Sequence, residues 1–226
     1  MPNCLITGVG RGIGYELARQ ALARGNRVIG SVRSPERAEE LKAELGDRFE
    51  PVVFDVTDGK AIEAVAAAIS FPIDVLIHNA GIIGPERQST LDMDFVGFEQ
   101  TMAVNVMAPL RVIQTFLPRI LAAERGRILV LSSRMGSLSY AKSDHIAYRA
   151  SKAALNKVLQ GVATDLKPQG VAVAAVHPGW VRTDMGGAGA DIDAETSARG
   201  ILQLAQTLDL ERTGRFFAYN GSEVAW

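Results

Sequence analysis

Tyr148 and Lys152 are the two side chains whose types and spacing most directly suggest chemistry. They lie four residues apart in a stretch with helical character, so both project from one face of the predicted helix. An ammonium group beside a phenol favours the phenolate, and we therefore expect Lys152 to lower the pKa of Tyr148. A tyrosine with such a pKa can exchange a proton with a substrate near neutral pH. The alternative is an ordinary tyrosine ring packed against a lysine stem.

A glycine-rich turn near the start of the chain is a second candidate site. The stretch from Leu5 to Ala18 reads LITGVGRGIGYELA, which gives the order strand, tight loop and helix, with four glycines between Thr7 and Gly14. Glycine allows positive φ and a close approach of a pyrophosphate, and the first free N–H groups of the helix point toward the phosphate. The loop therefore predicts a dinucleotide cradle, although such a segment is often only a turn.

The residues after the second predicted strand indicate which dinucleotide is bound. An NAD-binding unit usually has an Asp or Glu at this point to bind the ribose 2′-hydroxyl. Here Arg33 is present and the acidic residue is missing, and Arg11 in the glycine loop is a possible second cation. A guanidinium suits a 2′-phosphate by charge and by its fork geometry, so NADP(H) is favoured and NAD(H) is less expected. The alternative is that both arginines are simply solvated.

Short apolar runs alternate with amphipathic stretches along the whole chain, which is typical of a parallel sheet with helices on both faces. We predict an α/β fold in which residues 1–226 form a single domain around one Rossmann-like, doubly wound parallel sheet. Pro109 and Pro118 should kink or break the fourth helix. The expected strands are residues 3–7, 27–32, 50–54, 73–77, 127–131, 172–176 and 215–218, and the expected helices are residues 13–24, 35–45, 59–69, 95–123, 147–166 and 194–208.

Composition narrows the class of partner. The chain has 226 residues, 47% of them hydrophobic, and a formal net charge of −1 without a long basic run, so we expect small-molecule partners, no nucleic acid and no membrane association. No export signal or membrane-spanning segment is expected. Cys4 is the single cysteine, in an apolar strand, which favours a buried structural thiol and a reducing, cytoplasmic setting.

Taken together, these pieces resemble the short-chain dehydrogenase/reductase family in order and approximate spacing. The segments YRASKAALN and HPGWVRTDM and the ending at residues 214–226 look most like the small carbonyl-reductase branch that includes sniffer and C-factor. The residues that carry the resemblance are Thr7, Gly8, Gly12, Ile13, Gly14, Asn79, Ala80, Gly81, Asn105, Ser133, Tyr148, Lys152, Pro178, Gly179 and Thr183.

The resemblance implies an enzyme that reduces a carbonyl to an alcohol with NADPH, reversibly, through a tetrad of Asn105, Ser133, Tyr148 and Lys152. Tyr148 would be the general acid and base, and Ser133 would donate a hydrogen bond to the carbonyl oxygen. Lys152 would hold the nicotinamide ribose, and Asn105 would anchor a water that links Lys152 to solvent. Ser132 remains the weaker candidate for the catalytic serine.

The same resemblance implies where an NADP(H) cofactor is held, with Arg33 near its 2′-phosphate and Tyr148 and Lys152 at its nicotinamide end. It also implies a carbonyl or alcohol substrate and a homodimer or homotetramer. The other implied contacts are Gly8, Arg11, Gly12 and Ile13 with the phosphates, Asp55 and Val56 with the adenine, Asn79, Ala80 and Gly81 with the adenine ribose side, and Pro178, Gly179 and Thr183 with the carboxamide.

The chain departs from the family pattern in three places, the first of which is an additional glycine, Gly10, in the glycine loop. His78 stands where the family often has an Asn, and the gap between Ser133 and Tyr148 is slightly long, so we expect residues 135–145 to be rebuilt. The histidines are not clustered with cysteines or carboxylates at metal-site spacing, so we predict no metal.

The segment after Pro178 is short and rich in glycine. We infer an open pocket behind a short glycine-hinged loop, lined by apolar groups such as Met135, Trp180 and Met185, or else plain core packing and a turn. An alternative function for the whole chain is a nucleotide-binding regulatory or signalling protein of the same fold with little turnover.

Overall fold

The computed structural model describes residues 1–139 and 141–226, and its central feature is a seven-stranded sheet. The strand order is β3-β2-β1-β4-β7-β8-β9, and every neighbouring pair is parallel. The predicted Rossmann-like sheet is confirmed, and its strand ends differ from the expected ones by at most two residues. The strands are β1 Asn3–Thr7, β2 Arg27–Val32, β3 Phe49–Val53, β4 Val75–His78, β7 Arg127–Leu131, β8 Ala172–His177 and β9 Arg215–Ala218.

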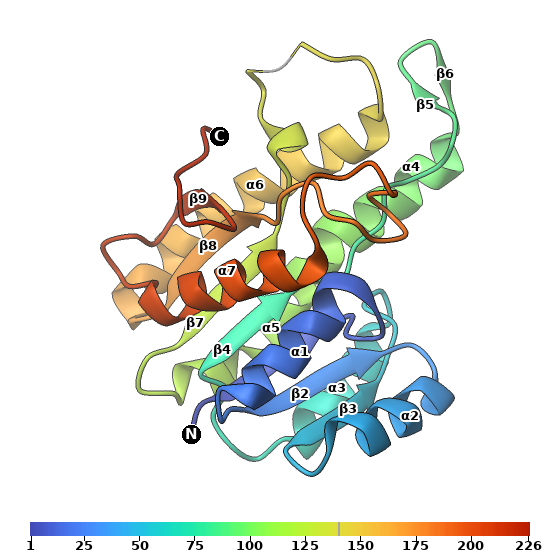
Figure 1. Ribbon diagram of the computed structural model, residues 1–226. Helices are drawn as coiled ribbons and strands as arrows, with labels where there is room; N and C mark the ends of the chain where they lie inside the picture. The colour runs from blue at the N-terminus through green and yellow to red at the C-terminus, as the bar shows by residue number, and fades with distance from the viewer. Residues whose placement is uncertain (140) are drawn as a thin grey trace.

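Helices cover both faces of this sheet (Figure 1). The core on one face takes side chains from α1, α2 and α7, and the core on the other face takes them from α3, α5 and α6. Successive strand residues alternate between the two, so Ile6 belongs to the first core and Leu5 to the second. The helices are α1 Gly12–Ala23, α2 Pro35–Leu45, α3 Gly59–Ala68, α4 Phe95–Met102, α5 Ala108–Leu121, α6 Ile146–Leu166 and α7 Ala194–Thr207.

The fourth predicted helix is divided, as expected, near its first proline. A π-helical segment, Ala103–Met107, separates α4 from α5, and Pro109 lies in the first turn of α5. Pro109 has no N–H group, so the carbonyl of Asn105 cannot receive the regular helical hydrogen bond from it. Pro118 lies inside α5, which continues to Leu121. The π-helical segment contains Asn105, one of the predicted site residues.

Two short strands that the sequence did not indicate form an antiparallel hairpin, β5 Gln88–Ser89 with β6 Asp92–Met93. Each has only two residues, which is too short to produce an alternating pattern. In Figure 1 the hairpin lies near α4 and the first turns of α6. Short 3₁₀ segments occur at Arg134–Gly136 and Lys167–Gln169. Tyr140, within the region expected to be rebuilt, lies outside the described residues.

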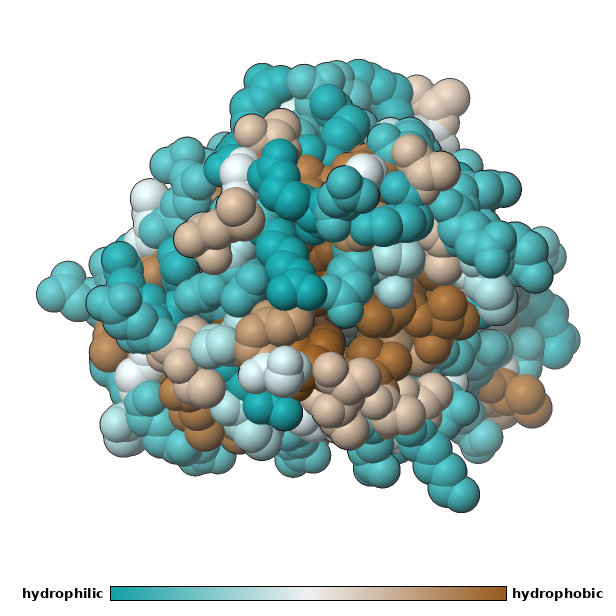
Figure 2. All heavy atoms as spheres, turned by 90° about the horizontal axis from the view of Figure 1, so that it is seen from below, coloured by the Kyte–Doolittle hydropathy of each residue, from teal (hydrophilic) through white to brown (hydrophobic). Residues whose placement is uncertain are grey.

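The surface seen from below is mostly hydrophilic, with an apolar area near the middle of the view (Figure 2). Elsewhere, exposed large apolar side chains occur around α4, at Leu91, Phe95, Val96 and Met107. Within the described residues, no helix combines the length and the apolar character that a membrane crossing requires.

Candidate active site

The predicted proton-transfer pair lies on the buried side of α6, beside the end of β7. Tyr148 is 9% exposed and Lys152 is 5% exposed, and the Lys152 Nζ lies 5.6 Å from the centre of the Tyr148 ring. The same Nζ donates a hydrogen bond to the carbonyl of Leu131 at 2.8 Å. Because Leu131 is the last residue of β7, this bond fixes Lys152 at the carboxyl edge of the sheet, where parallel sheets bind ligands.

The acid–base properties of the pair are set mainly by burial. Burial raises the pKa of Tyr148, and its interaction with the Ser133 hydroxyl opposes that rise only in part. The expected lowering of the Tyr148 pKa by Lys152 is therefore wrong for the chain by itself, because loss of water disfavours the phenolate. Burial also lowers the pKa of Lys152 from 10.5 to about 8, which weakens the ammonium as a source of positive charge near that pH.

The two neighbouring serines have different surroundings. The Ser133 hydroxyl interacts with the phenol of Tyr148 and accepts a hydrogen bond from the N–H of Met135 at 3.2 Å. The Ser132 hydroxyl instead donates to the Oδ1 of Asn156 on α6 at 2.5 Å, and Ser132 is 2% exposed. The structure thus brings Ser133 to Tyr148 and leaves Ser132 in a buried contact between sheet and helix.

Asn105 lies next to this group but uses its side chain within the protein. Its Oδ1 accepts from the N–H of Ile82 at 2.9 Å, and its Nδ2 donates to the Ile82 carbonyl at 2.8 Å and to the Ser151 hydroxyl at 3.0 Å. Gly81 keeps open the space between Asn105 and Lys152, because a Cβ there would lie 3.2 Å from the Asn105 Oδ1 and 3.7 Å from the Lys152 Nζ. Asn105 and Lys152 thus lie on either side of Gly81 in the same site, as expected. The water-anchoring role of Asn105 stays a prediction.

The glycine loop has the geometry of an anion cradle. Gly8 and Gly12 have φ of +73° and +57°, a region that L side chains rarely adopt. A Cβ on Gly14 would lie 2.1 Å from the Gly8 carbonyl oxygen, so only glycine allows this approach of α1 to the loop. Arg11, at the N-cap of α1, makes no capping bond through its side chain. The N–H groups of the first turn are thus available to a phosphate, and Ile13 packs against the core.

A polar bridge joins the ends of β1 and β4 beneath this loop. The Nδ2 of Asn79 donates to the carbonyls of Thr7 and Gly8 at 3.1 and 3.0 Å. The Thr7 hydroxyl accepts from the N–H groups of Asn79 and Ala80, each at 3.1 Å. Asn79 therefore acts as a support for the glycine loop, and Ala80 and Gly81 carry the chain on toward Lys152.

The segment after β8 folds back over the glycine loop. A Cβ on Gly12 would lie 3.2 Å from the Thr183 methyl group, and Arg11 forms an exposed ion pair with Asp184. Pro178 is held through its carbonyl, which accepts from the Ser197 hydroxyl at 2.6 Å. Gly179, with φ of +91°, turns the chain. Pro178, Gly179 and Thr183 thus lie at the same edge of the sheet as the other predicted cofactor contacts.

The ends of β2 and β3 carry the residues predicted to contact the 2′-phosphate and the adenine, namely Arg33, Asp55 and Val56. Hydrogen bonds from Thr57 and the charge of Arg33 hold the pKa of Asp55 below its usual value, so the side chains of Arg33 and Asp55 lie near each other. Val56, the next residue, is buried. Arg37, in the first turn of α2, donates through Nε to the Gly10 carbonyl at 3.0 Å and pairs through Nη1 with the Glu40 carboxylate at 2.8 Å. Arg37 was not among the residues singled out in the sequence, and its contact with the glycine loop makes it a further candidate for binding the cofactor.

His78 is buried and His177 is partly buried, and among the described residues neither belongs to a cluster that could bind a metal ion. His78 is 1% exposed, and neither of its ring nitrogens has a hydrogen-bond partner among the described residues. Burial and the charge of Lys152 lower the pKa of His78 to about 3, and burial, with the charge of Arg134, lowers that of His177 to about 4, so both are neutral at pH 7. Residues 1–139 and 141–226 hold no group of three or more His, Cys, Asp or Glu that could bind a metal ion.

A cavity of about 170 Å³ lies beyond the end of β8. Trp180 lines it, as the apolar-pocket hypothesis expects, but Arg134, Asp191 and Asn220 line it as well, so its wall is partly polar. Met185 is 49% exposed.

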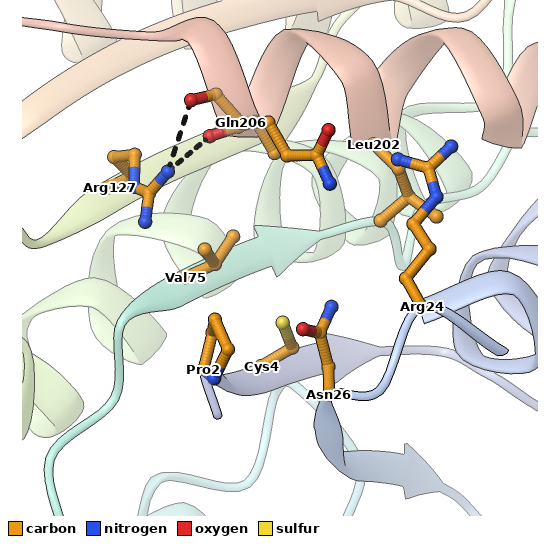
Figure 3. Close-up of a pocket in the computed structure, with 9 residues that line it drawn as sticks. Pro2, Cys4, Arg24, Asn26, Val75, Arg127, Leu202 and Gln206 are labelled. Carbon is orange, nitrogen blue, oxygen red and sulfur yellow. Dashed lines mark hydrogen bonds between the residues drawn. The ribbon is translucent and has the colours of Figure 1, made fainter. Parts of the chain in front are cut away.

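A smaller cavity, of about 60 Å³, lies at the opposite end of the sheet, where the strands begin (Figure 3). Cys4 lies there between Arg24 and Arg127, and burial is the main cause that raises the pKa of its thiol to about 12. The thiol stays protonated, as predicted for a structural cysteine.

Comparisons with known proteins agree with this geometry. The short chain dehydrogenase family profile matches residues 2–191. C-signal of Myxococcus xanthus is 44% identical over 157 residues, which cover 69% of this chain and 93% of that protein. The carbonyl reductase Sniffer of D. melanogaster superposes with a TM-score of 0.92 at 30% identity, over 100% of both chains. The structure of an NADPH-bound carbonyl reductase from chicken fatty liver gives a TM-score of 0.92 at 30% identity, over 100% of this chain and 99% of that one.

The family profile and the two superposed structures span the glycine loop, the sheet edge and the start of α6, and all the matches confirm the resemblance seen in the sequence. The fold, the strand order and the family profile lead to one conclusion. The chain belongs to the short-chain dehydrogenase/reductase family, whose members are NAD(P)-dependent oxidoreductases.

Proposed function

We propose that this protein reduces the carbonyl group of a small aldehyde or ketone to an alcohol with NADPH, and oxidises the alcohol in the reverse direction. The observation that carries the proposal is the buried phenol of Tyr148 beside the Ser133 hydroxyl, with Lys152 one helical turn further along α6. The carbonyl reductases among the structural neighbours support this choice of substrate class.

In this proposal Tyr148 holds the transferable proton on its phenol oxygen. Burial raises the pKa of Tyr148, so the phenol is protonated near neutral pH, which is the state that an acid needs for reduction. The Ser133 hydroxyl, next to that phenol, donates to the substrate oxygen and stabilises the charge that develops there. Lys152 keeps N–H groups free beyond its bond to Leu131, and these can bind ribose hydroxyls.

The residues of the chain fit NADP(H). When bound, the nicotinamide supplies or accepts the hydride. The free N–H groups at the start of α1 and the glycine loop would hold the pyrophosphate, and Arg33 with Arg37 would bind the 2′-phosphate. The NADPH in the chicken fatty liver carbonyl reductase structure supports this preference over NAD(H). The remaining contacts would come from Asp55, Val56, Asn79, Ala80, Gly81, Pro178, Gly179 and Thr183.

The test is NADPH oxidation over a panel of aldehydes, ketones and quinones, with the wild type and Tyr148→Phe. The variant should bind NADPH as the wild type does and lose about 10²–10⁴-fold in turnover, because positioned acid catalysis contributes that much. Tyr15→Phe is the matched control, since Tyr15 is bonded to Glu44 at the surface of α1 and should keep its activity. Wild-type turnover by Tyr148→Phe would contradict the proposal.

A second candidate is a regulatory or signalling protein of the same fold with little turnover. The 44% identity to a protein named C-signal favours it. The same panel separates the two functions, because this candidate predicts NADPH binding without oxidation of NADPH by any carbonyl compound.

We also propose that residues 1–226 form one catalytic domain that works in the cytoplasm as a homodimer or homotetramer. Strands from both ends of the chain share one sheet, and the single cysteine is buried and needs no oxidising compartment. The exposed apolar side chains around α4 offer a surface that a second copy could cover. Light scattering on the purified protein measures the assembly, and a monomer at micromolar concentration would contradict it.

A further inference from the structure

The catalytic helix α6 begins without a cap from its own sequence. His145 stands at the N-cap with φ of +52° and makes no capping bond through its side chain. The first regular helical bond runs from the N–H of Arg149 to the His145 carbonyl, so the N–H groups of Ile146, Ala147 and Tyr148 need other acceptors. Ala147 and Tyr148 are buried, at 0% and 9% exposure, so bulk water does not satisfy them.

Gln88, sixty residues earlier in the chain, supplies one of these acceptors. Its Oε1 accepts from the N–H of Tyr148 at 3.1 Å, and the side chain comes from β5 of the hairpin beside α6. Gln88 is 6% exposed, so water competes little for this bond. We infer that Gln88 is the N-terminal cap of α6 and the residue that positions Tyr148 for proton transfer, an inference that rests on the proposed function of Tyr148.

The orientation of the Gln88 amide is fixed from its other side. Its Nε2 donates to the Ile83 carbonyl at 3.1 Å and to the Pro85 carbonyl at 2.7 Å. A flipped amide would turn its NH₂ group toward the Tyr148 N–H and its oxygen toward two carbonyls, losing all three bonds. The two donations from Nε2 therefore fix the Gln88 Oε1 toward the backbone N–H of Tyr148.

The carbonyl of Tyr148 is held as firmly as its N–H. The Ser151 hydroxyl donates to the Tyr148 carbonyl at 2.7 Å and receives a bond from the Asn105 Nδ2, which also bonds the Ile82 carbonyl. Gln88 and Asn105 thus tie the Tyr148 backbone on both sides to the segment of residues 82–85. Gly84 in that segment has φ of +91°, and a Cβ on it would lie 2.9 Å from Thr101, so the segment has little room to move.

Two substitutions separate positioning from simple support of the fold. Gln88→Met keeps the side-chain length and removes all three hydrogen bonds, whereas Gln88→Glu keeps an oxygen acceptor for the Tyr148 N–H and loses both donations. Asp58→Ala is the matched control, because it removes the local cap of α3, where the Asp58 side chain accepts from the Ala61 N–H at 3.1 Å. Stability, kcat, KM and the isotope effect with NADPH deuterated at C4 are measured for each.

We expect Gln88→Met to lower kcat by about tenfold to a hundredfold, with KM changed little, because a small displacement of a catalytic group has effects of that size. Slower hydride transfer should also raise the isotope effect on kcat. Gln88→Glu should be no more stable than Gln88→Met and yet more active. Asp58→Ala should lose stability and keep kcat and the isotope effect of the wild type.

A readout without turnover is hydrogen exchange of the first turn of α6 in the cofactor-free protein, which should accelerate in Gln88→Met and not in Asp58→Ala. Unchanged exchange would overturn the cap, and accelerated exchange with wild-type kcat would overturn the positioning. If Gln88→Glu does not fold, the comparison of Gln88→Met with Asp58→Ala by itself tests the positioning role of Gln88. An active Tyr148→Phe would refute the proposed function, whereas an inactive one beside an unaffected Gln88→Met would refute only the role of Gln88.

Discussion

Replacing Lys152 with methionine should stabilise the cofactor-free protein at neutral pH, although it should abolish catalysis. Lys152 is buried, and burial lowers its pKa from 10.5 to about 8. Between those values the unfolded chain binds more protons than the folded one, so this lysine makes stability rise with pH across that window. Below pH 8 the lysine is charged in both states, and the full penalty of burying the charge applies.

The size of the effect follows from the two pKa values. Their difference corresponds to about 3 kcal/mol of lost stability at pH 7. Methionine has a similar length and no charge, but it leaves the Leu131 carbonyl without its partner, which costs about 1–3 kcal/mol. Lys152→Met should therefore be more stable than the wild type by up to about 2 kcal/mol at pH 7, and this advantage should vanish by about pH 10.

Urea unfolding of the two cofactor-free proteins at a series of pH values from 7 to 10 measures this difference. Other groups that titrate in the range, such as the Cys4 thiol, contribute equally to both proteins and cancel. Two results would refute the reasoning that the buried charge of Lys152 lowers stability and is retained for function: a stability difference that does not change with pH, or a Lys152→Met protein that is less stable than the wild type at pH 7.

Three further predictions concern the site. Ser133→Ala should lower turnover, whereas Ser132→Ala should mainly lower stability, because the Ser132 hydroxyl is bonded to α6 and lies away from the phenol. The measurements are kcat and the urea midpoint of each variant, and a larger loss of kcat in Ser132→Ala would contradict the choice of serine. Arg33→Asp should shift preference from NADPH toward NADH, and Arg37→Met should lower kcat/KM with NADPH more than with NADH. Equal values of kcat/KM with the two cofactors in the wild type would contradict the role given to these arginines. If the cavity beside Trp180 receives the substrate, a carbonyl panel should show broad acceptance with modest KM values, whereas activity on a single charged compound alone would argue against an open pocket.

The sequence determined the parts of the protein whose signals are local. The alternation of apolar runs and amphipathic stretches predicted the strands of the parallel sheet to within two residues, because burial on both faces of such a sheet imposes that pattern. The same holds for the glycine loop, in which the positive φ of Gly8 and Gly12 demands a residue without a Cβ. The spacing of Tyr148 and Lys152 is equally local, since one helical turn separates them.

Only the tertiary structure decided the features that depend on packing between distant segments. Which serine meets Tyr148, the direction of the Tyr148 pKa, and the cap that Gln88 provides from sixty residues away all follow from the placement of α6 against β7 and β5. A pKa responds to the water that packing excludes, and a long-range hydrogen bond has no period in the sequence. Charge and spacing alone therefore gave the wrong sign for the Tyr148 pKa, because the burial of that side chain is a property of the fold.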